Sequence, residues 1–185
     1  MLKTFRFLLA LAVALMLMLV FRALAFTICT VEGNGLEPVL QQGDRVLVNR
    51  WSYGLRVGSE GGLFGYGRLG RRPVSRGDLV AFENPHNTDE VLICRCKALP
   101  GDTISTADGQ TMVVPSLKTC NDADHYWMEA LGTEDVTDSR YWGFVPEDHI
   151  VGKPIFIWWS SDPDRGLFSG GIRWSRLFRF VDNIK

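Results

Sequence analysis

The feature that constrains this chain most is a long apolar stretch near its first residue. From Phe7 to Phe21 the sequence FLLALAVALMLMLVF contains no charge, and after Arg22 it continues as ALAFTI to Ile28. As an α-helix rising about 1.5 Å per residue, such a stretch can cross the roughly 30 Å hydrocarbon core of a bilayer. The sequence therefore predicts a transmembrane anchor over residues 7–28.

Basic residues before this stretch predict its orientation. Lys3 and Arg6 precede the apolar residues, and an excess of positive charge marks the cytoplasmic side of a membrane segment. We therefore expect residues 1–6 in the cytoplasm and residues 29–185 as one domain on the outer face of the membrane. No later stretch is long and apolar enough for a second span, which predicts a single-pass protein.

Two other interpretations of the N-terminal segment stay open. Ala23-Leu24-Ala25 has the small-x-small pattern of a signal-peptide cleavage site. However, Arg22 lies against that site and apolar residues continue beyond it, which favours retention of the anchor. A lipoprotein modified at Cys29 is less favoured still, because the bulky Ile28 stands where a small residue is expected.

The rest of the chain consists of short apolar runs separated by turn residues, which is typical of antiparallel β proteins. The expected strands cover residues 46–48, 79–82, 91–98, 150–151 and 155–159, with a hairpin of 103–105 and 111–114 about Asp108-Gly109. No segment here has a long helical apolar period. The predicted fold class is therefore mainly β, an antiparallel sheet that follows one N-terminal transmembrane helix.

Composition excludes several classes of function. A chain of 185 residues has room for one domain and an anchor. Its 20 Lys and Arg balance 21 Asp and Glu, so no strong field attracts nucleic acid. The four cysteines, Cys29, Cys94, Cys96 and Cys120, have neither CxxC spacing nor nearby histidines, which argues against a zinc site. We expect no metal and no cofactor.

Two further segments have ordinary explanations. Residues 65–70 fit the dinucleotide pattern GxGxxG, but that motif needs a helix after it and this one continues into Arg71-Arg72-Pro73. We interpret it as a loop with exposed aromatic residues. Residues 172–181 alternate arginines with aromatic residues, which fits a closing element of the domain or a segment at the membrane interface.

Four motifs stand in a fixed order behind the anchor. They are Gly35-Leu-Glu-Pro-Val-Leu40 before Gly43-Asp44, Arg76-Gly-Asp-Leu-Val-Ala-Phe82, Arg95 to Leu99 with Pro100-Gly-Asp102, and Asp138-Ser-Arg-Tyr-Trp-Gly-Phe-Val-Pro146. Together they resemble bacterial type I signal peptidases, the membrane-anchored proteases that remove signal peptides outside the cytoplasmic membrane. The resemblance extends from about residue 22 to about residue 181 and implies the antiparallel β fold of that family.

The resemblance also implies where the chemistry would lie. In that family a serine attacks the scissile carbonyl after a neutral lysine takes its proton. Matching the motifs puts Gly35 at the nucleophile and Cys94 at the general base. Gly33 falls where a serine hydroxyl assists the oxyanion, and Val136 falls where a hydroxyl supports the lysine.

Other residues match positions for scaffold and substrate. Asp138, Ser139 and Arg140 correspond to a structural motif in which an aspartate–arginine ion pair holds the loop under the site. A peptide groove is expected to be lined by Leu36, Pro38, Val39 and Phe82.

Two functional hypotheses follow. The first is a membrane-bound signal-peptidase homologue without catalytic activity that binds extended peptides, preproteins or an active signal peptidase during protein export. The alternative is an active signal peptidase with an unidentified nucleophile. Cys94 or Cys96 could serve only with an adjacent base, and nothing in the sequence places His86, His125 or His149 beside them.

Overall fold

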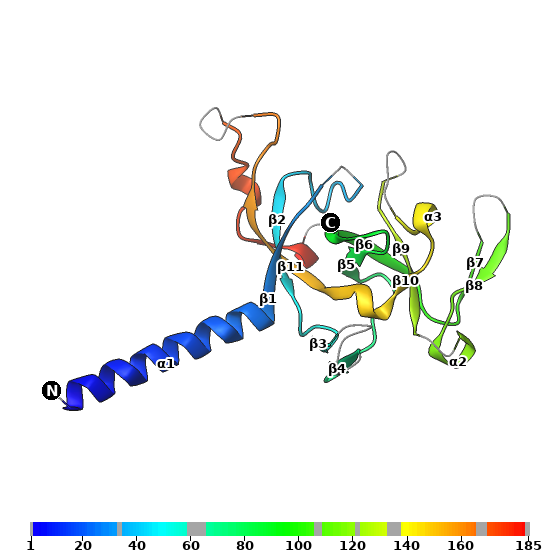
Figure 1. The fold of residues 1–185 in the computed structure, drawn as a ribbon. Coiled ribbons are helices and arrows are strands. Elements are labelled where there is room, and N and C mark those ends of the chain that lie inside the picture. Colours follow the sequence, from blue (N-terminus) through cyan, green and yellow to red (C-terminus); the bar gives the residue numbers. More distant parts are fainter. Residues whose placement is uncertain are drawn as a thin grey trace.

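A computed structural model describes residues 2–32, 35–58, 66–105, 109–120, 123–132, 138–165 and 170–183. One long helix projects from a β domain (Figure 1). The helices are α1 (Leu2–Ala25), α2 (Leu117–Cys120) and α3 (Ser139–Trp142), with 3-10 turns η1 (Glu147–His149), η2 (Trp174–Arg176) and η3 (Val181–Asn183). The strands are β1 (Phe26–Thr30), β2 (Asp44–Asn49), β3 (Leu55–Val57), β4 (Gly67–Leu69), β5 (Leu79–Asn84), β6 (Asn87–Ala98), β7 (Thr103–Ser105), β8 (Thr111–Val113), β9 (His125–Glu129), β10 (Val145–Pro146), β11 (Ile150–Ser160) and β12 (Arg179–Phe180).

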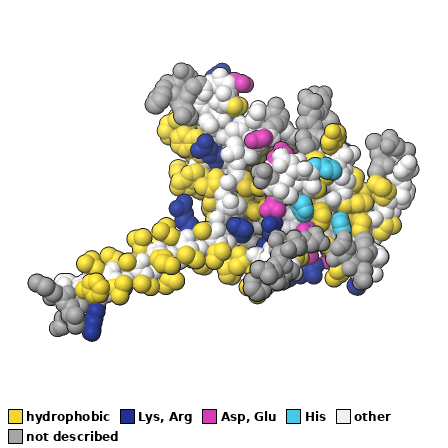
Figure 2. All heavy atoms as spheres, viewed as in Figure 1, with side chains coloured by type: hydrophobic (Ala, Val, Ile, Leu, Met, Phe, Trp, Pro, Cys, Tyr) yellow, Lys and Arg dark blue, Asp and Glu magenta, His cyan; other side chains and the backbone are white. Residues whose placement is uncertain are grey.

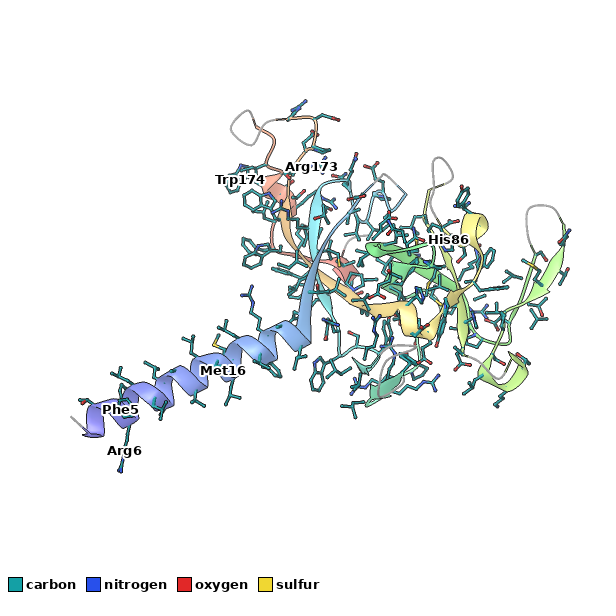
Figure 3. The ribbon with its side chains drawn as sticks, in the orientation of Figure 1. Phe5, Arg6, Met16, His86, Arg173 and Trp174 are labelled. Carbon is teal, nitrogen blue, oxygen red and sulfur yellow. The ribbon has the colours of Figure 1, made fainter. Side chains whose placement is uncertain are left out.

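Helix α1 has the length and composition of a membrane span. Its Thr4–Ala25 portion has a mean hydropathy of 2.6, and its most apolar 18-residue window contains no buried residue. Ala25, where the helix meets the β domain, is buried. Apolar side chains cover it in Figure 2, and Arg6 lies at the end far from the domain (Figure 3). The helix ends at Ala25, so residues 26–28 of the expected anchor belong to strand β1 instead.

The main sheet is antiparallel throughout. Its strand order is β1-β2-β11-β5-β6-β9-β10, and the short β12 pairs with β11. The expected strands lie within β2, β5, β6 and β11, and the predicted hairpin is formed by β7 and β8. The mainly β fold class is therefore confirmed.

Strand β5 divides the core of the domain into two clusters. Leu79 and Ala81 point into a first cluster, and Val80 and Phe82 point into a second cluster on the opposite face. Successive side chains of a strand alternate between its two faces, and here each face is covered by one of the two clusters. This explains why the sequence of β5 is continuously apolar rather than alternating.

A small hairpin of β3 and β4 is attached to the main sheet by arginines. Arg56 pairs with Glu83 of β5 at 2.8 Å. Arg71, just after β4, pairs with Glu147 and with Asp124, both at 2.6 Å. The second half of the glycine-rich motif thus lies in this hairpin, and residues 70–78 contain no helix that could hold a pyrophosphate.

Candidate functional site

The loop between β1 and β2 carries Gly35. The Gly35 carbonyl accepts hydrogen bonds from the backbone N–H groups of Leu131 (2.7 Å) and Gly132 (2.9 Å). These two residues follow β9, at the start of the connection towards α3. The position assigned to the nucleophile is therefore attached to the loop that carries the Asp138 motif.

The residues expected to line a peptide groove have different surroundings. Leu36 and Val39 are buried in the first cluster, whereas Pro38 is exposed. Phe82 is fully buried in the second cluster, where its ring meets that of Trp142 edge-on with centroids 6.2 Å apart. The structure thus places Leu36 and Val39 together and Phe82 on the other face of β5. Their role in binding peptide stays a prediction.

The position assigned to the general base lies on β6. Cys94 is buried in the second cluster. Burial raises the pKa of its thiol, the carboxylate of Asp138 raises it further, and Arg140 opposes both effects. Because the thiolate rather than the thiol is the nucleophile, Cys94 is held in its unreactive form at neutral pH.

Cys96 lies two residues further along the same strand and in the same cluster. Burial raises the pKa of its thiol to about 12. Two of the three histidines have backbone partners elsewhere: Nδ1 of His125 lies 2.9 Å from the Ala123 carbonyl, and Nδ1 of His149 lies 3.1 Å from the Glu83 carbonyl. Within the described ranges, no hydrogen bond joins a histidine to either thiol, and no group of acidic, His or Cys side chains has the arrangement of a metal site.

The Asp138 motif forms a compact hydrogen-bonded unit. Asp138 is completely buried and pairs with the guanidinium of Arg140 at 2.7 Å. Asp138 also accepts a hydrogen bond from the backbone N–H of Ala130, and the Ser139 hydroxyl oxygen accepts one from Met128 N–H, both at 2.9 Å. These bonds fasten the start of α3 to β9 and to the residues that contact Gly35. Gly33 and Val136 lie outside the described residues.

A second buried carboxylate, which the sequence interpretation missed, holds the other end of the Gly35 loop. Asp44 is completely buried and accepts hydrogen bonds from Ser160 Oγ (2.6 Å), Gln41 N–H (2.9 Å) and Arg176 Nη2 (2.7 Å). Arg176 Nη2 also donates to the Val39 carbonyl at 2.9 Å. Gly43-Asp44 was visible as a turn signal, but nothing in the sequence pointed to Arg176 as its partner.

Gly43 itself has a steric reason to be glycine. Its φ is +86°, and a Cβ at this position would collide with the carbonyl oxygen of Ser161. The chain can therefore approach β11 closely at the point where the loop turns into β2.

Two cavities flank Arg95, on the face of the sheet that carries the Gly35 loop. One, of about 340 Å³, is lined by Arg95, Lys97, Glu129, Ala130, Leu131, Gly132 and Arg140. The other, of about 150 Å³, includes Val39, Asp78, Arg95 and Lys153 in its lining. Both therefore include residues of the Gly35 loop or residues bonded to it.

Strand β1 is an edge of the main sheet. Among the described strands it pairs only with β2. Phe26 and Ile28 on this strand are partly exposed, at 36% and 46%. An edge strand offers unpaired backbone donors and acceptors to another extended chain.

Comparison with known proteins gives one consistent family. The sequence matches the family described as "Signal peptidase, peptidase S26" over residues 4–117 and 111–159. Signal peptidase I of Pseudomonas fluorescens is 24% identical over an alignment of 200 positions, and this alignment covers 79% of this chain and 69% of that protein.

Two further relatives match in different ways. Signal peptidase I of Buchnera aphidicola subsp. Acyrthosiphon pisum is 46% identical over 52 residues, 28% of this chain and 17% of that protein. Mitochondrial inner membrane protease subunit 2 of Saccharomyces cerevisiae is 27% identical over 132 residues, 71% of this chain and 67% of that protein. The chain thus spans only part of the length of each relative.

Proposed function

The chain belongs to the signal peptidase family, peptidase S26, and on that premise we propose that it is a membrane-anchored homologue that binds extended peptides without cleaving them. Its bound peptides are signal peptides or the preproteins that carry them. An active signal peptidase is a second kind of partner that the same surface could hold.

The proposal depends on the two residues, Gly35 and Cys94, at the positions that the resemblance assigns to the catalytic dyad. Gly35 has no side chain that could attack a carbonyl, and it contributes only a backbone carbonyl to the loop. Cys94 is a buried thiol whose pKa is raised, whereas a general base must be unprotonated near the working pH. Cys96, two residues further along the strand, is also a buried thiol whose pKa is raised.

The edge of β1 supports peptide binding. Strand addition draws its affinity from backbone hydrogen bonds, which need no catalytic side chain. β1 follows directly from α1 (Figure 1), so a peptide alongside it would lie near the membrane surface. A signal peptide that is still embedded in the bilayer would present its cleavage region at that height.

The anchor supports a location in the cytoplasmic membrane with the β domain on the outer face. Lys3 and Arg6 before the apolar stretch favour this orientation. The yeast relative is named as a subunit of a protease, which makes association with an active peptidase a reasonable second role. Protease added outside sealed cells should digest the β domain, whereas protection of the domain would reverse the proposed orientation.

One assay tests binding and cleavage together. Full-length protein in detergent micelles is titrated into a fluorescent Ala-x-Ala peptide and into a control with bulky residues at both alanine positions, and the peptides are then recovered for mass spectrometry. We expect weak binding that prefers Ala-x-Ala, with both peptides intact. Equal affinity for the two peptides contradicts the binding proposal.

Processing of a preprotein on gels tests the absence of catalysis. Turnover that survives Cys94→Ala and Cys96→Ala would overturn the proposal in favour of an unidentified nucleophile. Turnover abolished by Cys94→Ala alone would instead identify a thiol nucleophile.

A further inference from the structure

The larger of the two cavities beside Arg95 is unusually basic. Its lining contains three basic side chains, Arg95, Lys97 and Arg140, and one acidic side chain, Glu129. It lies between β6 and the end of β9, and two of its lining residues, Leu131 and Gly132, donate hydrogen bonds to the Gly35 carbonyl. The cavity therefore adjoins the loop where the resemblance places the nucleophile.

Two of the three cations are already paired. Lys97 Nζ lies 3.3 Å from Glu129, which also accepts a hydrogen bond of 2.8 Å from Trp127 Nε1. Arg140 is held by the buried carboxylate of Asp138 at 2.7 Å. The single acidic side chain of the lining is thus already occupied by Lys97 and Trp127.

Arg95 is different. It is exposed at the centre of the sheet, where its backbone pairs with Leu79 of β5 and Glu129 of β9. In the smaller cavity on its other side, Asp78 is paired with Lys153 at 3.0 Å. No ion pair among the described residues includes Arg95. Its guanidinium lies between the two cavities. The one acid of the larger cavity, Glu129, is bonded to Lys97 and Trp127. The smaller cavity also contains Asp182, which forms no ion pair with Arg95 or any other cation among the described residues.

We infer that this cavity holds the carboxylate of an aspartate or glutamate side chain from a peptide bound beside Gly35, with Arg95 as its partner. This inference rests on the proposed function and adds a preference for acidic residues. The planar guanidinium matches a carboxylate with two parallel hydrogen bonds. Ala130 and Leu131 in the same lining can contact the methylene groups of the acidic side chain.

The test compares matched peptides and matched variants of the full-length protein in detergent micelles. A fluorescent Ala-x-Ala peptide is prepared in a neutral series, with asparagine at one position at a time, and in an acidic series, with aspartate at the same positions. The variants are Arg95→Gln, Arg95→Lys and the control Arg72→Gln. Arg72 is also exposed but lines neither cavity, so its variant makes the same charge change elsewhere.

We expect aspartate at one position of the peptide to strengthen binding about fivefold over asparagine, since a partly exposed ion pair contributes up to about that factor. The preference should disappear in Arg95→Gln, persist in Arg72→Gln, partly return in Arg95→Lys, and weaken at high salt. Neutral peptides should bind Arg95→Gln as they bind the unaltered protein.

Each contrary result has its own meaning. Neutral peptides that bind while aspartate gives no preference at any position would overturn the acidic subsite and leave the proposed function standing. An equal loss of affinity for neutral and acidic peptides in Arg95→Gln would assign Arg95 a structural role and would also overturn the acidic subsite. Failure of every peptide to bind would overturn the proposed function and the subsite together. Inorganic phosphate that binds with the same dependence on Arg95, without any aspartate preference, would identify a site for free anions instead.

Discussion

Replacing Arg176 by alanine removes the counter-charge of a carboxylate that has no contact with solvent. Asp44 is completely buried, and the Arg176 side chain is only 11% exposed. Removing one partner of a buried ion pair typically costs about 3–5 kcal/mol, because an uncompensated charge remains. Asp44 keeps its bonds from Ser160 and Gln41, so we expect the lower end, about 3 kcal/mol. In a domain of this size that corresponds to a fall in Tm of about 6–12 °C.

Thermal unfolding of the full-length protein in micelles, followed by circular dichroism, measures this fall. Arg173→Ala is the matched control, because Arg173 lies on the same segment (Figure 3) and donates to the Gln42 carbonyl, but its nearest acid, Asp162, is 4.0 Å away and partly exposed. We expect that control to lose less than about 1 kcal/mol. Adding Asp44→Asn to Arg176→Ala should restore part of the stability, since the buried charge is then gone. Equal shifts for the two arginine variants, or no recovery in the double variant, would refute the reasoning.

Three other predictions concern the dyad positions, the thiols and the C-terminal segment. Gly35→Ser alone should not process a preprotein on gels, because losing either member of a nucleophile–base pair costs nearly as much activity as losing both. Cleavage by the double variant Gly35→Ser with Cys94→Lys should be detectable but slow. Cleavage by the single variant would contradict this prediction. Burial raises the pKa of Cys29 to about 11 and of Cys96 to about 12, so both thiols bind their proton more tightly in the folded state. Denaturation at a series of pH values should therefore give full stability below about pH 8.5 and a decline towards pH 11–12. A stability that does not change above pH 9 is inconsistent with buried thiols. Trp174 is 72% exposed and Trp127 only 5%, so we expect brominated lipids to quench the fluorescence of Trp174. This quenching should be lost in Trp174→Phe and kept in Trp127→Phe. Equal quenching in both variants would exclude Trp174 from the membrane interface.

The sequence predicted strands where a short apolar run lay between turn residues, since this pattern is typical of a strand. The run Leu79 to Phe82 between turn residues was recognisable as a strand, and the structure explains its continuous apolar character by cores on both faces. Strand β9 was missed, because His125 to Glu129 mixes polar and aromatic residues without alternation while burying its three central residues. The end of the anchor was also ambiguous, since Phe26 to Ile28 are apolar enough for a helix, yet β-branched and aromatic residues also favour a strand.

Contacts between distant parts of the chain could not be predicted from the sequence for a different reason. Asp44 and Arg176 are 132 positions apart, and no local pattern connects them. Their meeting depends on the pairing of β2 with β11, which brings Ser160 opposite Asp44 and the segment after β11 over the loop. Arg95 is a similar case, because it stood in a motif without an assigned role, and only the structure shows that it forms no ion pair among the described residues.

The buried scaffold residues and the two positions that the resemblance assigns to the dyad contribute differently to the stability of this fold. Gly35 contributes a backbone carbonyl to its loop, and Cys94 fills space in the second cluster as a small apolar side chain. Neither position supplies a side-chain hydrogen bond that holds the described parts of the domain together. Asp44, Asp138 and Ser139, by contrast, are buried and accept bonds from several elements, and leaving such groups unpaired is costly. These three residues therefore stabilise the fold independently of any catalytic chemistry, whereas Gly35 and Cys94 supply no such side-chain bond. Strand addition at β1 would use backbone hydrogen bonds of the scaffold, so the proposed peptide binding does not depend on the side chains at positions 35 and 94.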